Sequence, residues 1–416
     1  MKIYDRIIKC RLCGSGKLKA VVKFKPQYVA TTLVKTNENN PSAQLKAPLT
    51  LMLCGKCGLA QLQETMKPDL LYRTYFYRSS VGETMRRDLK TVVGDVLSRV
   101  DAKPGDRVLD IGCNDGLMLA MFPPHLERVG IDPAQNIDRS HHDKSINFVQ
   151  DYFPSEKLSG QKFKVITSTA MFYDLNDPNK AVRDIKKLLD KDGVVCLQVS
   201  SLCAMIKDLN FYDICHEHLE YYSLKTLCEL LRRNGMTVFD ASTNEVNGGS
   251  LRVMVAHKEA KRPISDNLKY LLLTEEIFHL EDEGTYKTFT KLVEHSTRQV
   301  RRYIDDALKE KKTVIALGAS TKGNVMLQLC GIDKKIIPYI SERNTAKVGL
   351  RTAGTDIELI AEDSARAMMP YSMFVIPWNF KAEIVAREKD YLDRGGRLLF
   401  IMPYPYVIDK DGEKRL

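Results

Sequence analysis

The run Arg107-Val108-Leu109-Asp110-Ile111-Gly112-Cys113-Asn114-Asp115-Gly116 decides the fold class of this chain. Its first five residues are mostly apolar, as in a strand that is buried on both faces of a sheet. A turn containing two glycines follows directly, and residues 117–121 have the composition of a helix. Strand, glycine turn and helix in this order form the opening unit of a doubly wound α/β sheet.

The residues after this turn continue the same alternation. A second strand over 129–132 ends in Asp132, about 20 residues after the turn, where an acidic side chain usually binds a ribose diol. Asp151, Tyr152 and Phe153 come next. Hydrophobic patterning then predicts strands over 163–167 and 193–198 with a helix over 179–189 between them, and a helix ending near Arg99 before the first strand.

The glycine spacing indicates which ligand the turn accepts. Asp110-x-Gly112-x-x-x-Gly116 differs from the Gly-x-Gly-x-x-Gly of pyrophosphate binders. It suits the methionyl and ribosyl parts of S-adenosylmethionine, and it resembles motif I of class I methyltransferases. A dehydrogenase-like nucleotide-binding domain and a purely structural Rossmann domain are the alternatives.

Four of the ten cysteines form two Cys-x-x-Cys-Gly turns, Cys10 with Cys13 and Cys54 with Cys57. The glycines permit the tight turn that points two thiolates at one ion. The four cysteines therefore predict a structural zinc site, and four thiolates leave no open position for a catalytic water. Redox dithiols and core cysteines are the alternatives.

A second cluster, residues 211–223, packs histidines, glutamates and tyrosines together as Phe-Tyr-Asp-Ile-Cys-His-Glu-His-Leu-Glu-Tyr-Tyr-Ser; we call it the histidine loop. A histidine with a pKa near neutrality can remove a proton alpha to a carbonyl, and a neighbouring glutamate can orient it. This chemistry is what methylation at carbon requires. A metal pair at His216 and His218 and a solvated polar loop are the alternatives.

The C-terminal part predicts a second α/β sheet. A charged helical segment over 263–311 leads into a strand, 313–317, and a second glycine turn, 318–324, with further strands over 336–340, 373–377 and 397–401. Lys322 at this turn suits a phosphate, and Arg343, Lys347 and Arg351 follow the next strand, where the ligand crevice of such a sheet opens.

The length and net charge of the chain limit the classes of protein to which it can belong. The chain has 416 residues, 44% of them hydrophobic, and a formal net charge of +10. These values predict several cores and anionic partners. The sequence lacks a signal-peptide apolar region and a long apolar span, so we expect a cytoplasmic protein with no membrane partner. We predict three domains: zinc-binding, 1–70; methyltransferase, 71–258; and C-terminal, 259–416.

The whole chain resembles the C-methyltransferases that act on nucleotide-linked 4-keto-6-deoxy sugars. The matching stretches are Cys10 to Cys57, Tyr75 to Ser80, Val108 to Gly116, His216 to His218 with Tyr221 to Ser223, Asn247 to Val253, Gly318 to Asn324, Ser341 to Asn344, and Pro377 to Phe380. The resemblance implies a class I (Rossmann-like) methyltransferase domain flanked by a zinc-binding domain and a C-terminal Rossmann-like domain. It also implies methyl transfer to C-3 through an enolate, with the nucleotide diphosphate held by the C-terminal domain.

Residue patterns and resemblance together predict the following sites. His218 is the candidate base and His216 its rival, Glu217 is a partner of the base or a sugar ligand, and Tyr75 or Tyr77 is a lid contact to sugar or cofactor. S-adenosylmethionine is assigned to Tyr75, Asp110, Gly112, Asn114, Gly116, Asp132, Asp151, Tyr152 and Phe153. The GDP- or dTDP-linked sugar is assigned to Tyr222, Asn247, Lys322, Asn324, Arg343, Lys347 and Arg351. Three positions depart from the family: Cys215 replaces a tyrosine, and Met171 and Asn247 stand where histidine is common.

Two alternative functions are an RNA-binding or RNA-modifying zinc protein and a non-catalytic sugar-nucleotide-binding relative. Aromatic residues are not interleaved with Lys and Arg as in an RNA-binding platform, so we expect no nucleic-acid partner. We also expect a monomer.

Overall fold

A computed structural model describes residues 3–29, 33–35, 44–80, 82–140, 144–320 and 322–416. Thr321 of the second glycine turn lies outside these ranges. The chain divides into two compact units. The first unit comprises residues 1–20, 51–204 and 217–283, and the second comprises 21–50, 205–216 and 284–416.

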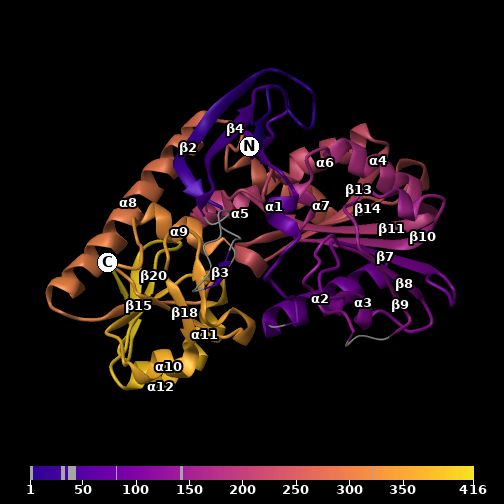
Figure 1. Ribbon diagram of the computed structural model, residues 1–416. Helices are drawn as coiled ribbons and strands as arrows, with labels where there is room; N and C mark the ends of the chain where they lie inside the picture. The colour runs from indigo at the N-terminus through magenta and orange to yellow at the C-terminus, as the bar shows by residue number, and fades with distance from the viewer. Residues whose placement is uncertain (1–2, 30–32, 36–43, 81, 141–143, 321) are drawn as a thin grey trace. The chain divides into compact units, whose positions relative to one another are not determined.

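The first unit is built on a seven-stranded sheet (Figure 1). From edge to edge its strands are β13 (Met236–Asn244), β14 (Ser250–His257), β11 (Leu189–Ser200), β10 (Phe163–Thr169), β7 (Arg107–Ile111), β8 (Glu127–Ile131) and β9 (Ile146–Val149). Strands β11, β10, β7, β8 and β9 pair in parallel, and β14 is antiparallel to both of its neighbours. The predicted doubly wound class I methyltransferase fold is confirmed.

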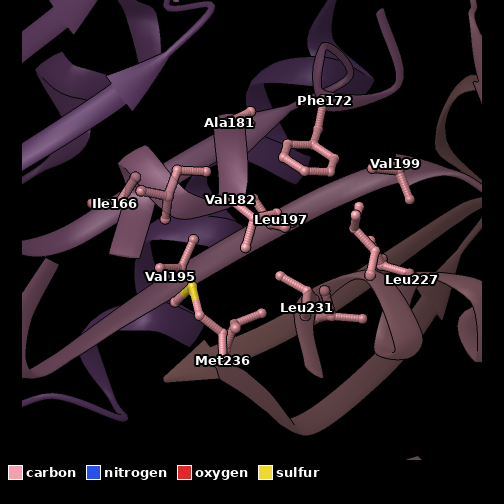
Figure 2. Close-up of a cluster of buried hydrophobic side chains, with 14 of the residues drawn as sticks. Ile166, Phe172, Ala181, Val182, Val195, Leu197, Val199, Leu227, Leu231 and Met236 are labelled. Carbon is pink, nitrogen blue, oxygen red and sulfur yellow. The ribbon is translucent and has the colours of Figure 1, made fainter. Parts of the chain in front are cut away.

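Helices cover both faces of this sheet. Figure 1 shows α2 (Glu83–Leu97) and α3 (Leu117–Met121) on one face, with α4 (Pro178–Leu188), α6 (Leu224–Arg233) and α7 (Asp266–Glu276) on the other. Alternate strand residues serve the two cores: Val194 and Cys196 pack with α2 and α3, whereas Val195 and Leu197 pack with α4 and α6 (Figure 2). This alternation is why the strands are apolar throughout.

The zinc-binding region contributes short antiparallel strands. Strands β1 (Tyr4–Arg6) and β6 (Glu64–Met66) pair with each other, and a four-stranded sheet has the order β12 (Glu220–Tyr221), β5 (Ala60–Leu62), β4 (Lys46–Cys54), β2 (Leu18–Tyr28). Helix α1 (Asp69–Tyr72) follows. Strand β12 belongs to the histidine loop, so this region and the loop share a sheet.

The second unit contains a nine-stranded sheet. Its order is β22 (Gly412–Arg415), β21 (Tyr406–Asp409), β20 (Leu398–Phe400), β19 (Ser372–Val375), β15 (Val314–Leu317), β16 (Tyr339–Glu342), β18 (Glu358–Ala361), β17 (Leu350–Thr352) and β3 (Leu33–Lys35). The five strands from β20 to β18 are parallel. The remaining helices are α5 (Leu202–Lys207), α8 (Glu283–Lys309), α9 (Gly323–Leu329), α10 (Glu362–Ala367), α11 (Lys381–Arg387) and α12 (Lys389–Asp393).

Most predicted elements are present within a few residues of their expected bounds. One strand differs: 336–340 was expected, and β16 begins only at Tyr339. The amides of Ile336 and Ile337 both donate to the carbonyl of Asp333, so the preceding residues form a turn. The predicted domain ranges 1–70, 71–258 and 259–416 remain a proposal. None of the helices in the described ranges combines the length and hydropathy that a membrane crossing needs.

Candidate active site and zinc centre

The four predicted zinc ligands converge in the first unit. Their Sγ atoms all lie within 4.8 Å of one another, with 3.6 Å between Cys10 and Cys57 and 3.6 Å between Cys13 and Cys54. Four thiolates bound tetrahedrally at about 2.3 Å would be roughly 3.8 Å apart, so the cluster has the size of a zinc tetrahedron. The cysteines therefore fit a structural Zn²⁺, as predicted.

The turn at residues 112–116, here called the cofactor loop, is held by the end of β8. The Gly112 amide donates to the Ile131 carbonyl at 2.8 Å, and the Asn114 amide donates to Asp132 Oδ2 at 3.0 Å. Gly112 and Gly116 have φ of +76° and +82°, which favour glycine. At Gly112 an added Cβ would lie 2.7 Å from Cγ of Met171, so the loop after β10 closes tightly over the cofactor loop.

Asp132 has the setting expected of a ribose ligand. Besides Asn114 it accepts from the Ala134 amide at 2.9 Å, and Arg139 lies 3.2 Å from Oδ1. A carboxylate has about four acceptor positions, so a ribose hydroxyl can be added. Asp110 lies deeper: its Oδ1 accepts from Thr167 Oγ1 at 2.8 Å, and burial raises its pKa to about 8. Asp110 is thus hydrogen-bonded to β10, and its contact with S-adenosylmethionine remains a prediction.

The segment Tyr75–Ser80 is tied directly to this site. The amides of Ser79 and Ser80 donate to Asn114 Oδ1 at 3.2 Å and Asp115 Oδ2 at 3.0 Å, and Asn114 Nδ2 donates to the Tyr77 carbonyl at 3.2 Å. The structure thus brings Tyr77 to the cofactor loop, whereas the backbone of Tyr75 is hydrogen-bonded to Asn136; both tyrosines are half-buried.

The next predicted cofactor residues lie just after β9. Tyr152 donates its hydroxyl to Asp69 at 2.7 Å, Asp151 accepts from Ser155 at 2.8 Å, and Phe153 is buried in the core. Hydrogen bonding to Ser155 lowers the pKa of Asp151, which keeps this acid ionised. Their contact with S-adenosylmethionine remains a prediction.

The first-unit part of the histidine loop, residues 217–223, lies beside the loop after β10. The ring of His218 meets the ring of Tyr173 edge-on at 4.4 Å between centroids, and the Leu219 amide donates to the Tyr173 carbonyl at 2.9 Å. Tyr173 follows Met171, the residue packed on Gly112. His218 and the cofactor loop are therefore linked through one short segment. Glu217 is buried beside His218, and its carbonyl accepts from Tyr72 at 3.1 Å.

Tyr222, a predicted substrate residue, lies in the core of the first unit. It is fully buried, 6.0 Å from Phe172 between ring centroids, and its hydroxyl has no hydrogen-bond partner among the described residues. Burial raises its pKa well above the usual value. A substrate contact for Tyr222 remains a prediction.

His216 belongs to the second unit and is fully buried. Its Nε2 lies 3.1 Å from the Ala47 carbonyl, which can only accept, so Nε2 carries the proton. Nδ1 is then an acceptor without a hydrogen-bond partner in the described part of the chain. Burial lowers the pKa of His216 to about 4, so the ring is neutral at neutral pH.

The second glycine turn repeats the hydrogen bonds of the cofactor loop. The Gly318 amide donates to the Ser341 carbonyl at 2.8 Å, as Gly112 donates to Ile131. Glu342 Oε2 accepts from the Ala319 amide at 2.9 Å and Oε1 from the Asn344 amide at 2.8 Å, as Asp132 accepts from two amides. Lys347 donates to the Ala319 carbonyl at 2.9 Å, as Arg139 donates to that of Asn114 at 2.8 Å.

The other predicted substrate residues of this unit have partners in the protein. Lys322 forms a buried ion pair with Asp213, and its Nζ lies 5.0 Å from the Tyr212 ring centroid. Asn324 donates to the Ala353 carbonyl at 2.9 Å and accepts from Thr355 at 2.8 Å. Arg343 pairs with Glu383 at 2.7 Å, and Arg351 pairs with Asp356. Asn247, in the first unit, is half-buried with φ of +57°. Substrate contacts by these residues remain predictions.

Sequence reasoning missed several residues that shape these sites. Arg78 donates to the carbonyls of Tyr75 and Tyr77. Arg139 donates to the carbonyl of Asn114 in the cofactor loop. Glu342 has the same place beside the second glycine turn as Asp132 has beside the cofactor loop. Among these residues, only Glu342 could have been predicted from sequence, because it is an acidic residue at the end of the strand that follows a glycine turn.

Comparisons with known proteins match three successive stretches of the chain. Three family models match in order: "Putative zinc binding domain" over residues 10–72, "Methyltransferase domain" over 83–241 and "C-methyltransferase C-terminal domain" over 245–403. C-methyltransferase NovU of Streptomyces niveus is 28% identical over 413 residues, covering 97% of this chain and 98% of the relative.

Solved structures match only in part. A methyltransferase from Clostridium acetobutylicum is 11% identical with a TM-score of 0.32, covering 41% of this chain and 92% of its own. The 1,6-didemethyltoxoflavin-N1-methyltransferase of Burkholderia thailandensis is 15% identical with a TM-score of 0.33, covering 41% and 77%. The matched family models, together with the strand order, cofactor loop and cysteine cluster, show a zinc-binding domain, a methyltransferase domain and a C-methyltransferase C-terminal domain in this order, so the chain is an S-adenosylmethionine-dependent C-methyltransferase with an N-terminal zinc-binding domain.

Proposed function

We propose that the protein methylates C-3 of a nucleoside-diphosphate 4-keto-6-deoxyhexose and that His218 is the base. The observation that carries the proposal is the link from the cofactor loop through Met171 and Tyr173 to His218. A carbon acid alpha to a ketone needs a base beside the methyl donor, and the proximity of His218 to this segment supports an imidazole in that role.

In the proposed reaction His218 takes the proton from C-3, and the electron pair of that C–H bond becomes the enolate of the 4-keto group. S-adenosylmethionine, when bound, would supply the methyl to which C-3 of the enolate forms its new bond, while the methyl–sulfur bond breaks and the sulfur leaves as a neutral sulfide. Asp132 and the backbone of residues 112–116 hold the ribosyl and methionyl parts, and Tyr75 and Tyr77 cover them. The rate gain then comes mostly from alignment and from excluding water.

The nucleotide diphosphate is assigned in this proposal to the second glycine turn. Its support is the repeated hydrogen-bond pattern, in which Glu342 stands where Asp132 stands in the first sheet. Arg343, Lys347 and Arg351 follow that strand, and in this proposal a bound diphosphate would compete with their present partners Glu383, the Ala319 carbonyl and Asp356. A GDP or dTDP linkage fits this assignment equally well.

The test is mass spectrometry of GDP- and dTDP-linked 4-keto-6-deoxyhexoses after incubation with the protein and S-adenosylmethionine. The proposal predicts a gain of one methylene on at least one sugar. It also predicts loss of that gain in His218→Gln, with the affinity for S-adenosylmethionine unchanged. A protein that binds S-adenosylmethionine and methylates none of the panel would be a non-catalytic relative or one with another acceptor, and the proposal would be wrong.

A further inference from the structure

Arg11 lies inside the first zinc turn, between Cys10 and Cys13, yet its side chain points into the protein. Only 2% of that side chain is exposed. Its Nη1 donates to the Leu62 carbonyl at 2.7 Å, and its Nη2 donates to Thr65 Oγ1 at 2.7 Å. The backbone of this turn is also held, because the Arg11 amide donates to Gln61 Oε1 at 3.0 Å and Asn179 Nδ2 donates to the Arg11 carbonyl at 2.7 Å.

The residues to which Arg11 is hydrogen-bonded are in turn bonded to the last part of the histidine loop. Strand β5, with Gln61 and Leu62, pairs with β12, and the Leu62 amide donates to the Leu219 carbonyl at 2.9 Å. Leu219 follows His218, and its own amide donates to the Tyr173 carbonyl. A continuous path of hydrogen bonds thus runs from the zinc turn through Arg11 and Leu62 to the residue next to His218.

A buried acidic side chain lies beside this path. The carboxylate of Glu220 is fully buried, and Arg11 Nε lies 3.5 Å from its Oε1. Neither Glu220 oxygen has a hydrogen-bond donor among the residues that the structure describes. Burial raises the pKa of Glu220 well above its usual value, and the positive charge of Arg11 opposes that rise, so the two residues interact across 209 positions of sequence.

We propose that Arg11 is a positioning residue for His218, through which the zinc turn fixes the orientation of the base. The inference rests on the proposed function only in taking His218 as the base. A guanidinium suits the task because its planar fork reaches a carbonyl, a hydroxyl and a carboxylate at once, whereas an ammonium is a point charge.

The main variant is Arg11→Lys, which keeps a charge beside Glu220 and loses the fork. The matched control is Lys56→Met, because Lys56 lies inside the second zinc turn and its side chain is exposed. We expect Arg11→Lys to retain one zinc per chain and its affinity for S-adenosylmethionine while kcat falls by about 10- to 100-fold, as misplacement of a catalytic group predicts. Lys56→Met should match the wild type in all three.

A second readout does not depend on the acceptor. The His218 imidazole can be followed by NMR of protein carrying ¹³C at Cε1, with its signal assigned by its absence in His218→Gln. We expect the chemical shift and titration midpoint of His218 to change in Arg11→Lys and to stay the same in Lys56→Met. If the wild type methylates no acceptor but the His218 signal still moves, the proposed function fails while the positioning role stands.

A lower melting temperature with unchanged kcat and an unchanged His218 signal would overturn the inference, because Arg11 would then be a packing residue only. If Arg11→Lys loses zinc or does not fold, Arg11→Met/Glu220→Gln replaces it, since this double variant leaves no unpaired buried charge. Normal kcat in that double variant would also overturn the inference.

Discussion

At the scale of single residues, the two histidines of the histidine loop differ in their surroundings. His218 lies against Tyr173, beside the segment that packs on the cofactor loop. His216 donates from Nε2 to the Ala47 carbonyl and is fully buried. Burial lowers the pKa of His216 to about 4, which makes it a weak base, and this is a reason to assign the base to His218.

Burial of His216 predicts a pH dependence of stability. Its pKa is about 4 in the folded protein and about 6.5 when unfolded, so the unfolded chain binds the proton first as pH falls. Stability from this group is complete above pH 6.5 and is lost between about pH 6.5 and 4, by about 3 kcal/mol.

Urea unfolding of the wild type, of His216→Gln and of His295→Gln across this pH range measures the effect. The first variant should lose this part of the pH dependence, because glutamine can still donate to Ala47 and does not titrate. His295 is exposed on α8, so its variant should behave like the wild type. If His216→Gln kept the wild-type pH dependence, the lowered pKa of a buried His216 would not be its cause.

At the scale of elements, the turn between β7 and α3 is the feature on which cofactor binding depends. Gly112→Ala would place Cβ 2.7 Å from Cγ and 3.0 Å from Cβ of Met171, in a backbone conformation with φ of +76°. Because the Met171 atoms nearest its backbone must move, we expect a loss of affinity for S-adenosylmethionine of about tenfold or more, from overpacking of about 1–3 kcal/mol.

Gly105→Ala is the matched control for this variant. Gly105 has φ of +87°, and an added Cβ there meets nothing within 4 Å. It should therefore lower stability through backbone strain without changing affinity. Calorimetric titration with S-adenosylmethionine compares the two, and equal affinities would contradict the assignment of the cofactor loop.

Elements of this kind can be predicted from sequence because the signals are local. The apolar run 107–111, the glycines after it and the acid at the end of the next strand lie within 26 residues, and the structure has them as expected. Both zinc turns are equally local. What could not be predicted is which charges pair across long separations.

Lys322 and Arg11 illustrate that limit. Lys322 lies in a glycine turn, where a phosphate contact is the natural expectation, yet its Nζ pairs with Asp213, 109 positions away in sequence. Arg11 reaches Glu220 across 209 positions. No local pattern distinguishes a lysine or arginine that faces solvent from one that neutralises a buried carboxylate. The hydrogen bonds around Glu342, which repeat those around Asp132, likewise could not be predicted from the sequence, because they depend on how the two turns fold.

At the scale of the whole molecule, the zinc-binding region shares a core with the methyltransferase sheet. Cys10, Leu12, Cys54 and Leu59 belong to the same buried cluster as the residues of α4 and α6 that cover one sheet face. The zinc turns therefore contribute to the stability of the first unit as a whole, beyond their own loops.

We expect one zinc per chain by elemental analysis and a lower melting temperature after removal with a chelator. Hydrogen exchange should increase in β5 and β12 as well as in the cysteine turns, because Arg11 joins them. Re-addition of zinc should restore both. A metal-free protein with unchanged melting temperature would show that the cluster does not stabilise the fold through a metal.

The central claim is that the protein forms an enolate at C-3 of a 4-keto sugar and methylates that carbon. The most direct measurement is hydrogen exchange at C-3 in D2O, with the acceptor identified in the panel, S-adenosylhomocysteine in place of the methyl donor, and NMR detection. The account predicts deuterium at C-3 with the wild type, and only the uncatalysed rate with His218→Gln. Two results would contradict the assignment of His218 as the base that forms the enolate. One is an acceptor that is methylated with S-adenosylmethionine but shows no enzyme-dependent exchange with S-adenosylhomocysteine. The other is exchange at the wild-type rate in His218→Gln.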